Sequence, residues 1–314
     1  MTNKWVRPIL PIVIGFAALA ILLYLGNAIA SMRGGENAYG LGAQTALGIG
    51  GWITWLIIGA VIVYVVYVFF ADQPIWNVGT REVVFMAIGA VLYGLLSWAT
   101  NVSTIVVPSV SLVSLRPAVA IPPLFGFLFG PVVGFFAGAF GNILGDALTG
   151  WGVFPAWDLG NGLLGMIPGL LMVFATKKKQ SATITWVVAA LALIAAAFTL
   201  FAPGSTFENP ITGEQANHST FWWVLVLGAV VIVAAYFLFR QQTEINTAIV
   251  WSALGVIVGI GFASIADIWI NGYTPVVAIL GEFVPAVGPD IIFVAVLVPI
   301  LLIAYRAAMV RGGR

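Results

Sequence analysis

The sequence has no cysteine, a single histidine and very few charged residues. The missing cysteines exclude disulfides, thiolate metal sites and cysteine nucleophiles. The one histidine, His218, stands in a polar segment, and we interpret it as a solvated loop residue. Only 7% of the residues are charged, whereas a soluble domain carries about a quarter. The net charge of +1 argues against a nucleic-acid partner, because such a partner favours a basic face.

The sequence also lacks the usual signatures of catalysis. No phosphate loop of the form G-x-x-x-x-G-K-S/T occurs, so the chain is not expected to hydrolyse ATP by that route. No cluster of metal ligands and no nucleophile–base pair stands out. We therefore predict a protein that is not an enzyme and that needs neither a metal nor a cofactor.

Long apolar runs dominate the chain instead. Hydrophobic residues make up 61% of it and the mean hydropathy is +1.10, a composition that lipid solvates and water does not. Each span needs about 20 apolar residues, and the runs predict an all-α, polytopic transmembrane helical bundle of about ten spans. The predicted spans are 9–30, 46–70, 83–100, 116–130, 131–148, 160–175, 183–202, 221–239, 247–266 and 288–305. The first run is too long for a signal-peptide core, and the fourth opens with three prolines, so we expect it to be oblique or partly unwound.

Basic residues are distributed unequally between the predicted loops. With the N-terminus inside, all Lys and Arg except Arg33 and Arg116 fall on the cytoplasmic side. The acidic residues lean towards the outer face. This asymmetry predicts a multi-pass protein of the cell membrane, with both termini and Lys177–Lys179 cytoplasmic and residues 203–220 outside.

Polar residues gather between positions 116 and 170. Gly134, Gly138, Asn142 and Asp146 recur at every fourth position and therefore share one helix face. Glycines at this spacing favour close helix packing. A carboxylate inside a span costs roughly 2.5–3.5 kcal/mol, so Asp146 is expected to face a cavity or a structural partner such as Arg116.

A loop with two tryptophans follows this helix. Trp151 and Trp157 are either ligand-stacking rings or ordinary interface anchors. Asp158 is either a ligand-binding group or a helix N-cap, and Asn161 follows one turn later. Because aromatic planes and directional polar groups converge here with Asn142 and Asp146, we expect a site for a flat, heteroaromatic, vitamin-sized ligand.

A second polar cluster occurs near the C-terminus. Asp267 and Trp269 are predicted to line the same cavity, together with the region from Glu282 to Asp290, where Asp290 is a further candidate N-cap. Residues 101–115 are too rich in Ser and Pro for a span and too apolar for a solvated loop. They are either a loop that folds over the mouth of a cavity or an imperfectly recognised span.

Several of these segments resemble a known family, the substrate-binding S components of energy-coupling factor (ECF) vitamin transporters. The resemblance rests on patterned glycines and prolines over roughly residues 83–175 and 247–306. It is carried by the runs RPAVAIPPLFGFLFGPVVGFFAGAFGNILGD, WDLGNGLLGMIPGLL, GFASIADIWINGY and GEFVPAVGPDIIFVAVLVPILLIAYR.

The resemblance implies a six-helix core that captures a micronutrient from outside and docks on a transmembrane coupling subunit with a pair of cytosolic ATPases. It implies a site formed by residues 101–115 together with Asp158, Asn161, Asp267, Trp269 and Glu282. It also implies that small residues spaced by four on the first core helix, here Ala90 and Gly94, contact the coupling subunit.

This chain departs from the family pattern by two additions. Residues 1–82 form an extra N-terminal hairpin and residues 176–246 an inserted hairpin, while residues 83–175 and 247–314 supply core helices one to four and five to six. We thus expect a single transmembrane domain.

The predicted function is a substrate-capture subunit of an ATP-driven importer. The ligand class includes thiamine or its pyrimidine, riboflavin and a queuosine precursor. The alternative is a stand-alone ion-coupled secondary transporter that uses its buried Asp residues.

Overall fold

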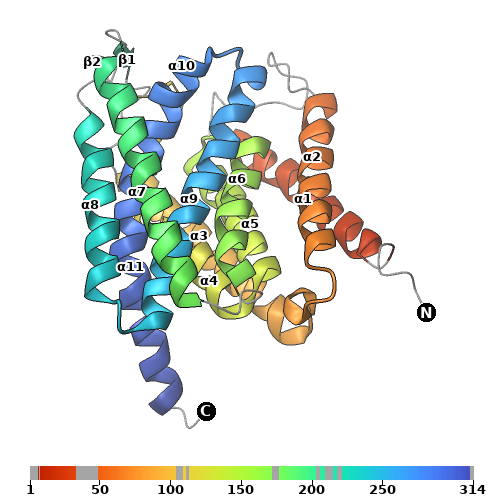
Figure 1. The fold of residues 1–314 in the computed structure, drawn as a ribbon. Helices are drawn as coiled ribbons and strands as arrows, with labels where there is room; N and C mark the ends of the chain where they lie inside the picture. Colours follow the sequence, from red (N-terminus) through yellow and green to blue (C-terminus); the bar gives the residue numbers. More distant parts are fainter. Residues whose placement is uncertain are drawn as a thin grey trace.

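The computed structural model is a bundle of helices with one short β-hairpin (Figure 1). It describes residues 6, 8–32, 49–103, 109–110, 113–171, 177–202, 206–208, 215–217 and 221–311. The elements are α1 (Ile9–Met32), α2 (Ile49–Phe69), η1 (Pro74–Trp76), α3 (Thr80–Ser103), η2 (Pro117–Ala120), α4 (Ile121–Phe129), α5 (Pro131–Thr149), α6 (Pro155–Leu170), α7 (Lys177–Phe201), β1 (Thr206–Glu208), β2 (Gln215–Asn217), α8 (Trp222–Leu238), α9 (Thr243–Ile270), α10 (Pro275–Ala278), the π-helix η5 (Ile279–Phe283) and α11 (Val284–Arg311).

Many of these helices have the length and composition of membrane spans. In the described part of the chain, six helical segments are long and apolar enough to cross a membrane, namely Ile9–Gly26, Thr80–Asn101, Pro131–Thr149, Gln180–Phe201, Thr243–Ile270 and Pro275–Arg311. Three shorter apolar helices are Thr54–Phe69, Pro117–Phe129 and Trp222–Leu238. The predicted all-α polytopic bundle is therefore confirmed, while the number of about ten spans stays a prediction.

Proline and glycine set the ends of the helices around the site. The fourth predicted span begins with the 3₁₀ turn η2 and continues as the short helix α4, so its start is wound more tightly than an α-helix and is not unwound. Gly130, with φ +106°, is the single residue between α4 and α5, and Pro131 follows at the first position of α5. Gly150, with φ +86°, ends α5 in the left-handed region that favours glycine.

The predicted boundaries are wrong at two places. The helix α6 begins at Pro155, five residues before the predicted span, because proline is well suited to the first turn. The segment before the last span is helical rather than a loop. There Thr274 caps α10, and the chain continues through the π-helix into α11.

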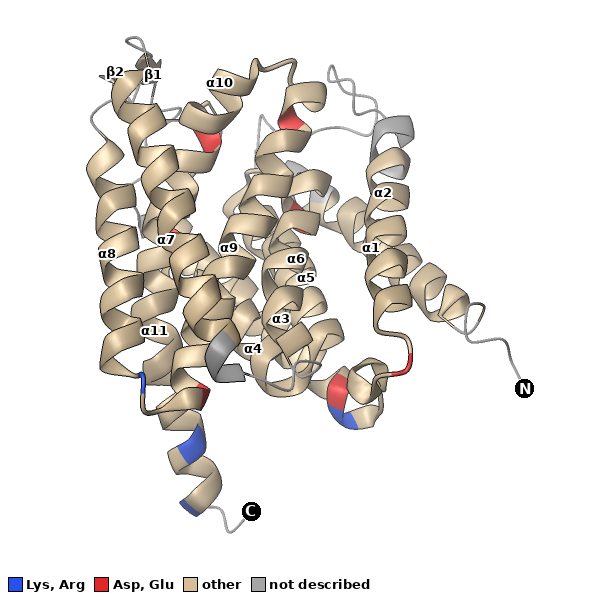
Figure 2. Ribbon diagram, in the orientation of Figure 1, with Lys and Arg blue, Asp and Glu red and all other residues tan. Residues whose placement is uncertain are grey.

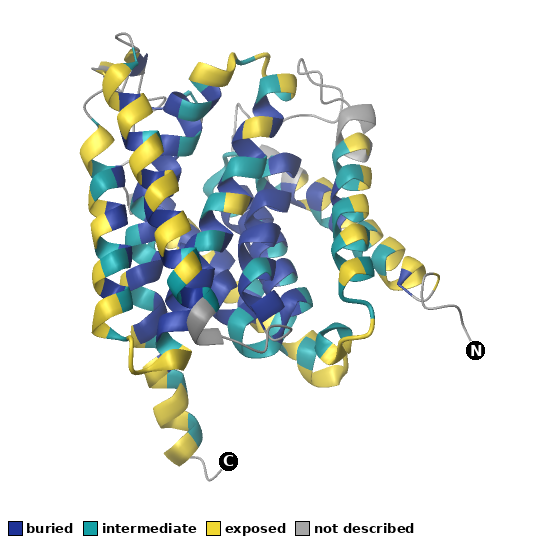
Figure 3. Ribbon diagram, in the orientation of Figure 1, coloured by how far each residue is buried: buried dark blue, intermediate teal, exposed yellow. Residues whose placement is uncertain are grey.

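A central group of helices, α3 to α6 with α9 and α11, carries the buried core. Figure 1 shows α1 and α2 on one side of this group and α7 and α8 on the opposite side. Contacts of α1 with α5, of α7 with α9 and of α8 with α11 attach these hairpins to the centre. The site described below lies among α3, α5 and α6. Most residues of α5 and α6 are buried, whereas many residues of α3 are exposed (Figure 3).

Large apolar side chains cover the outside of the bundle. They include Leu10 and Ile14 on α1, Val84 and Leu92 on α3 and Ile194 on α7, each more than two-fifths exposed. Such a belt is stable in lipid and costly in water. Charged residues lie mainly towards the ends of the bundle (Figure 2).

The orientation of the bundle in the membrane stays a prediction. Several residues on which it depends lie outside the described part of the chain, as does the interpretation of His218. They are Lys4, Arg7, Arg33 and Arg314, together with most of the segment 203–220; for Lys177–Lys179 only the backbone is described.

Candidate substrate-binding site

The glycines of α5 bring its backbone against the backbone of α6. A Cβ atom on Gly138 would lie 2.0 Å from the carbonyl oxygen of Asn161, and one on Gly134 would lie 2.1 Å from that of Gly165. No side chain fits at either position. The packing role expected for these glycines thus agrees with the structure. Gly134, Gly138, Asn142 and Asp146 form one stripe along α5. The close approach at the two glycines places the other two residues of this stripe, Asn142 and Asp146, beside the first turn of α6.

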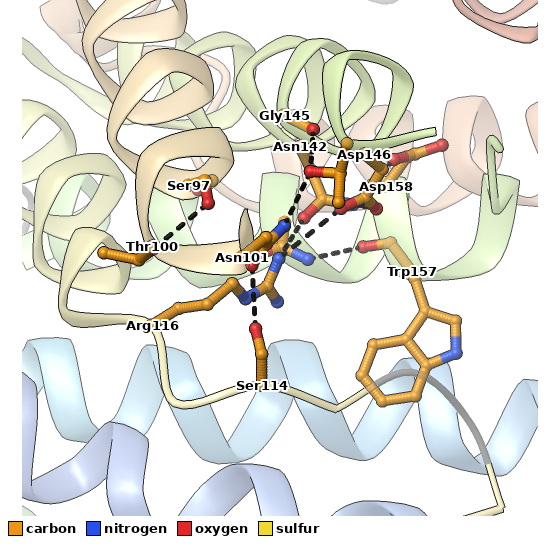
Figure 4. Close-up of polar contacts among 12 residues, drawn as sticks. Ser97, Thr100, Asn101, Ser114, Arg116, Asn142, Gly145, Asp146, Trp157 and Asp158 are labelled. Carbon is orange, nitrogen blue, oxygen red and sulfur yellow. Dashed lines mark hydrogen bonds and ion pairs between the residues drawn. The ribbon is translucent and has the colours of Figure 1, made fainter. Parts of the chain in front are cut away.

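Asn142 is the centre of a buried polar network (Figure 4). Its Oδ1 accepts a hydrogen bond of 2.9 Å from Arg116 Nη1. Its Nδ2 donates to Asp146 Oδ2 at 2.8 Å and to Asp158 Oδ1 at 2.9 Å. The amide orientation follows from these partners, because an arginine can only donate and the two carboxylates accept. The network joins α5, α6 and the residue before η2.

Two carboxylate oxygens of this network have no hydrogen-bond partner within the described protein. They are Asp146 Oδ1 and Asp158 Oδ2, on residues that are 5% and 0% exposed. Arg116 Nη1 lies 3.9 Å from Asp146 Oδ1, a distance at which it attracts the carboxylate without a hydrogen bond. A buried acceptor without a donor is unfavourable. Of the two residues, Asp146 lines the cavity described next, whereas Asp158 is not among its lining residues.

A narrow cavity of about 40 Å³ opens beside the network. Its lining residues are Val113, Ser114, Arg116, Asn142, Asp146, Trp151, Phe154, Trp157, Ala286 and Asp290. Four of the predicted site residues, Asn142, Asp146, Trp151 and Trp157, therefore converge here with Arg116. Asp290, which is buried on α11, adds a further carboxyl group to the cavity.

A much larger groove of about 840 Å³ lies elsewhere, between α1, α2 and α5. None of the predicted site residues lines it. We assign the site to the smaller cavity, because directional polar groups and aromatic rings meet there.

Asn161 has a structural position rather than a place on the cavity wall. Its Oδ1 accepts a 2.6 Å hydrogen bond from the hydroxyl of Tyr93 on α3, and its Nδ2 donates to the carbonyl of Trp157 at 2.9 Å. Both Tyr93 and Asn161 are fully or almost fully buried. Asn161 therefore holds α3 against α6 and fixes the turn that carries Trp157 and Asp158.

Trp157 connects the cavity to the second predicted cluster. Its indole Nε1 donates a 2.8 Å hydrogen bond to Asp267 Oδ2 on α9. The side chain of Glu282, on the π-helix, is fully buried and lies next to the same carboxyl group. Trp269 is 69% exposed and points outward, so the structure does not bring it to the cavity.

The described part of the segment 101–115 fits a covering loop and not a span. Val110 N donates to the carbonyl of Gly281, and the hydroxyl of Tyr273 donates to the carbonyl of Val110, both at 3.1 Å. Ser114 donates to Asn101 at 2.8 Å, and Ser114 also lines the cavity. Residues 104–108 and 111–112 lie outside the described residues.

Both N-cap interpretations are wrong. Asp158 is the fourth residue of α6, Phe154 occupies the cap position, and the Asp158 carboxylate accepts from Asn142 instead. Asp290 lies inside α11, which begins at Val284. Neither residue therefore occupies an N-cap position. Asp290 lines the cavity, and Asp158 is connected to it through Asn142.

The docking role predicted for Ala90 and Gly94 does not fit their position. A Cβ on Gly94 would lie 2.8 Å from the side chain of Leu144, and one on Gly141 would lie 2.9 Å from the carbonyl of Ala90. These residues face α5 within the chain. Small residues spaced by four do mark a close helix contact, but here the contact is internal.

Sequence reasoning undervalued three members of the site. Arg116 was considered only as a structural partner, although an arginine in an apolar stretch is itself a strong signal. Asp290 was considered as a helix cap and as the end of the region from Glu282 to Asp290, not as a site residue by itself. Tyr93 gave no signal, because an aromatic residue in an apolar run is ordinary. Among the described residues, no group of three or more His, Asp or Glu could hold a metal ion.

Comparisons with known proteins agree with the geometry. The family model of the ECF-type riboflavin transporter, S component, matches residues 77–217. UPF0397 proteins of Aliivibrio fischeri strains MJ11 and ES114 are each 38% identical over 105 residues, which is 33% of this chain and 55% of the relative. A UPF0397 protein of Vibrio atlanticus is 39% identical over 104 residues, with the same shares. The chain thus spans about half the length of these curated relatives. No solved structure matches the chain significantly.

The matched region starts before α3 and ends in β2, so it contains the α5–α6 network and also α7. It extends into residues 176–246, and the division of the chain into core and inserted hairpin stays a prediction. The resemblance to S components is confirmed over residues 77–217, which match the family model of ECF-type riboflavin transporter S components.

Proposed function

We propose that this chain is the substrate-capture subunit of an ATP-driven ECF-type importer for a vitamin-sized, heteroaromatic micronutrient. The family match supports a substrate-binding transporter subunit. The apolar helices support a multi-pass protein of the cell membrane, for which we retain both termini on the cytoplasmic side. The lipid bilayer, the coupling subunit and the ATPase pair are the partners in this proposal.

One observation carries the proposal. A buried network of Arg116, Asn142, Asp146 and Asp158 lies at the end of α5, and the rings of Trp151 and Trp157 line the adjoining cavity. An apolar bundle retains such a group of polar side chains at considerable cost, and in membrane proteins it usually marks a substrate pathway. Aromatic faces with a few directional donors and acceptors suit a flat heterocycle.

The size of the cavity adds a requirement. Pockets for drug-sized ligands have roughly 300–1,000 Å³, whereas this cavity has about 40 Å³. A vitamin-sized ligand therefore requires the cavity to widen. The loop that contains Val113 and Ser114 and the ring of Trp157 form much of its wall, so they are the elements that we expect to move.

An uptake experiment tests the energy source. The chain is reconstituted in vesicles alone and with a coupling subunit and ATPase pair, and uptake of a radiolabelled vitamin panel is measured. We expect uptake only with the complete set of subunits and ATP, and none when the phosphate-loop lysine of the ATPase is substituted. Uptake by this chain alone, driven by an ion gradient, would overturn the proposal.

The alternative is a stand-alone, ion-coupled secondary transporter. It is favoured by the buried carboxyl groups of Asp146, Asp158, Asp267 and Asp290, since carboxyl groups in spans often relay protons. It is disfavoured by the family match, which describes a subunit of a larger importer. The same vesicle experiment separates the two functions.

A further inference from the structure

The cavity next to the α5–α6 network has an excess of acidic groups. Asp146, Asp158 and Asp290 are all at least 95% buried, and Arg116 is the one basic side chain that acts on them among the described residues. One guanidinium can balance one carboxylate. The remaining carboxyl groups must bind a proton or a positively charged partner, because unpaired charges in a membrane interior are unfavourable.

The hydrogen bonds show the same imbalance between donors and acceptors. Asn142 already donates both amide hydrogens, one to Asp146 and one to Asp158. Asp146 Oδ1 and Asp158 Oδ2 are nevertheless left without a donor. The backbone N–H of Phe154 also acts on the Asp158 carboxylate, whereas a donor to Asp146 Oδ1 can come from a ligand.

Arg116 is poorly placed to receive an anion. One of its nitrogens donates to Asn142 and lies 3.9 Å from Asp146. A carboxylate or phosphate bound to this guanidinium would lie beside an existing carboxylate and be repelled by it. Trp151 and Trp157 also line the cavity, and the face of an indole ring attracts cations and not anions.

We propose that the ligand presents a cationic or amidine-like group with at least two N–H donors to Asp146 and Asp158, and that ligands with an anionic group at this end are rejected. The inference rests on the proposed function, and it narrows the ligand class from heteroaromatic micronutrients in general to nitrogen-rich ones that donate hydrogen bonds. Arg116 acts as a fixed counter-charge inside the site and does not itself bind the ligand.

A binding panel sorted by charge tests the inference. Purified protein is titrated with N–H-donating, cationic or amidine-like compounds (thiamine, its aminopyrimidine half and the aminomethyl deazaguanine precursor of queuosine). Neutral riboflavin and the anions biotin and pantothenate complete the panel. Binding is read from thermal unfolding and calorimetry. We expect the compound that binds to belong to the first group and its affinity to fall by about tenfold or more in Asp158→Asn and in Asp146→Asn.

A matched variant controls for the loss of an acidic residue in general. Asp72→Asn makes the same chemical change at an exposed residue outside this cavity, and its affinity should equal that of the wild type. Thermal unfolding without ligand shows whether each variant is folded. Because two site variants are tested separately, the test still works if one of them does not fold.

Three outcomes would overturn the inference. Binding of riboflavin or of an anion in preference to the first group contradicts it and leaves the proposed function standing. An affinity that is unchanged in both site variants contradicts it as well. If no compound of the panel binds, the inference fails, and the uptake experiment above then decides the proposed function independently.

Discussion

The two halves of the α5–α6 contact differ in what fills the space between the helices. In the first half, Gly134 and Gly138 leave no space at all, and the two backbones touch. In the second half, one turn later on the same face, Asn142 and Asp146 extend side chains that meet Asp158 and Arg116. The stripe is thus one continuous pattern with two functions.

The difference indicates how a bundle can hold a polar site in lipid. Close backbone packing fixes the helices without any need for side-chain rearrangement. The second, polar half of the contact can then retain hydrogen-bond acceptors without donors, because the close packing in the first half offsets their unfavourable free energy. Substitutions in the first half should therefore affect folding, whereas substitutions in the second half should affect ligand binding, and also folding where they break the hydrogen-bond network.

The largest effect is expected in the packed half. Gly138→Ala places a methyl group 2.0 Å from the carbonyl oxygen of Asn161, and backbone cannot give way as a flexible side chain does. We expect little folded protein after purification, and a strongly lowered unfolding temperature in what remains. The control is Gly228→Ala, whose nearest neighbour would be at an ordinary 3.5 Å, and which should be neutral or stabilising by about 0.5–1 kcal/mol. Equal stability of the two variants would show that the α5–α6 contact is looser than described.

The centre of the network should give the next largest effect. Asn142→Ala removes three hydrogen bonds and leaves Arg116 and two carboxylates without their common partner. We expect a destabilisation of about 3–5 kcal/mol, as for a broken buried charge pair. Asn246→Ala is the matched control, because that buried side chain donates one hydrogen bond to a carbonyl, and its loss should cost about 0.5–1.5 kcal/mol. Thermal unfolding followed by tryptophan fluorescence measures both, and a smaller effect at Asn142 would contradict its central role.

Asp158→Asn should separate binding from folding. The amide keeps the shape of the side chain, and α6 does not depend on it for capping, since Phe154 occupies the cap position. We therefore expect a nearly unchanged unfolding temperature and a ligand affinity lowered about tenfold or more. Calorimetry with the compound identified from the panel measures the affinity. A variant that binds like the wild type would remove Asp158 from the site.

The smallest effect is expected at the aromatic wall. Trp157→Phe retains a ring but loses the indole hydrogen bond to Asp267, which is worth about 1.5–3 kcal/mol for a charged acceptor in isolation. Because the phenyl ring still stacks and the lost hydrogen bond is within the protein, we expect a loss of affinity of only about severalfold. Trp269→Phe, at a residue that is 69% exposed, should change nothing. Equal effects of the two substitutions would exclude Trp157 from the cavity wall.

The stripe on α5 could be predicted because a spacing of four is a property of any α-helix. The helix against which that stripe packs could not be predicted, because the spacing of residues along one helix carries no information about its neighbour. The same limit explains Ala90 and Gly94, which mark a close contact correctly but face α5 and not another protein.

Of the two residues predicted from the second polar cluster, the structure connects Asp267 to the cavity but not Trp269, and the reason is geometric. Residues 267 and 269 are separated by about 200° around a helix, so Asp267 and Trp269 cannot both face one cavity once α9 continues to Ile270. The sequence interpretation ended that span at residue 266 and treated the following residues as a loop. The N-cap interpretation of Asp158 was wrong for a similar reason, because Pro155 begins the helix earlier.

The most direct test of the site compares what the protein carries when it is purified. Small molecules released from the wild type and from the double variant Asp146→Asn, Asp158→Asn are identified and quantified by mass spectrometry, after co-expression in cells supplied with the vitamin panel. The account predicts a nitrogen-rich, vitamin-sized molecule from the wild type and at most about a tenth as much from the folded double variant. Equal amounts from both proteins would contradict it.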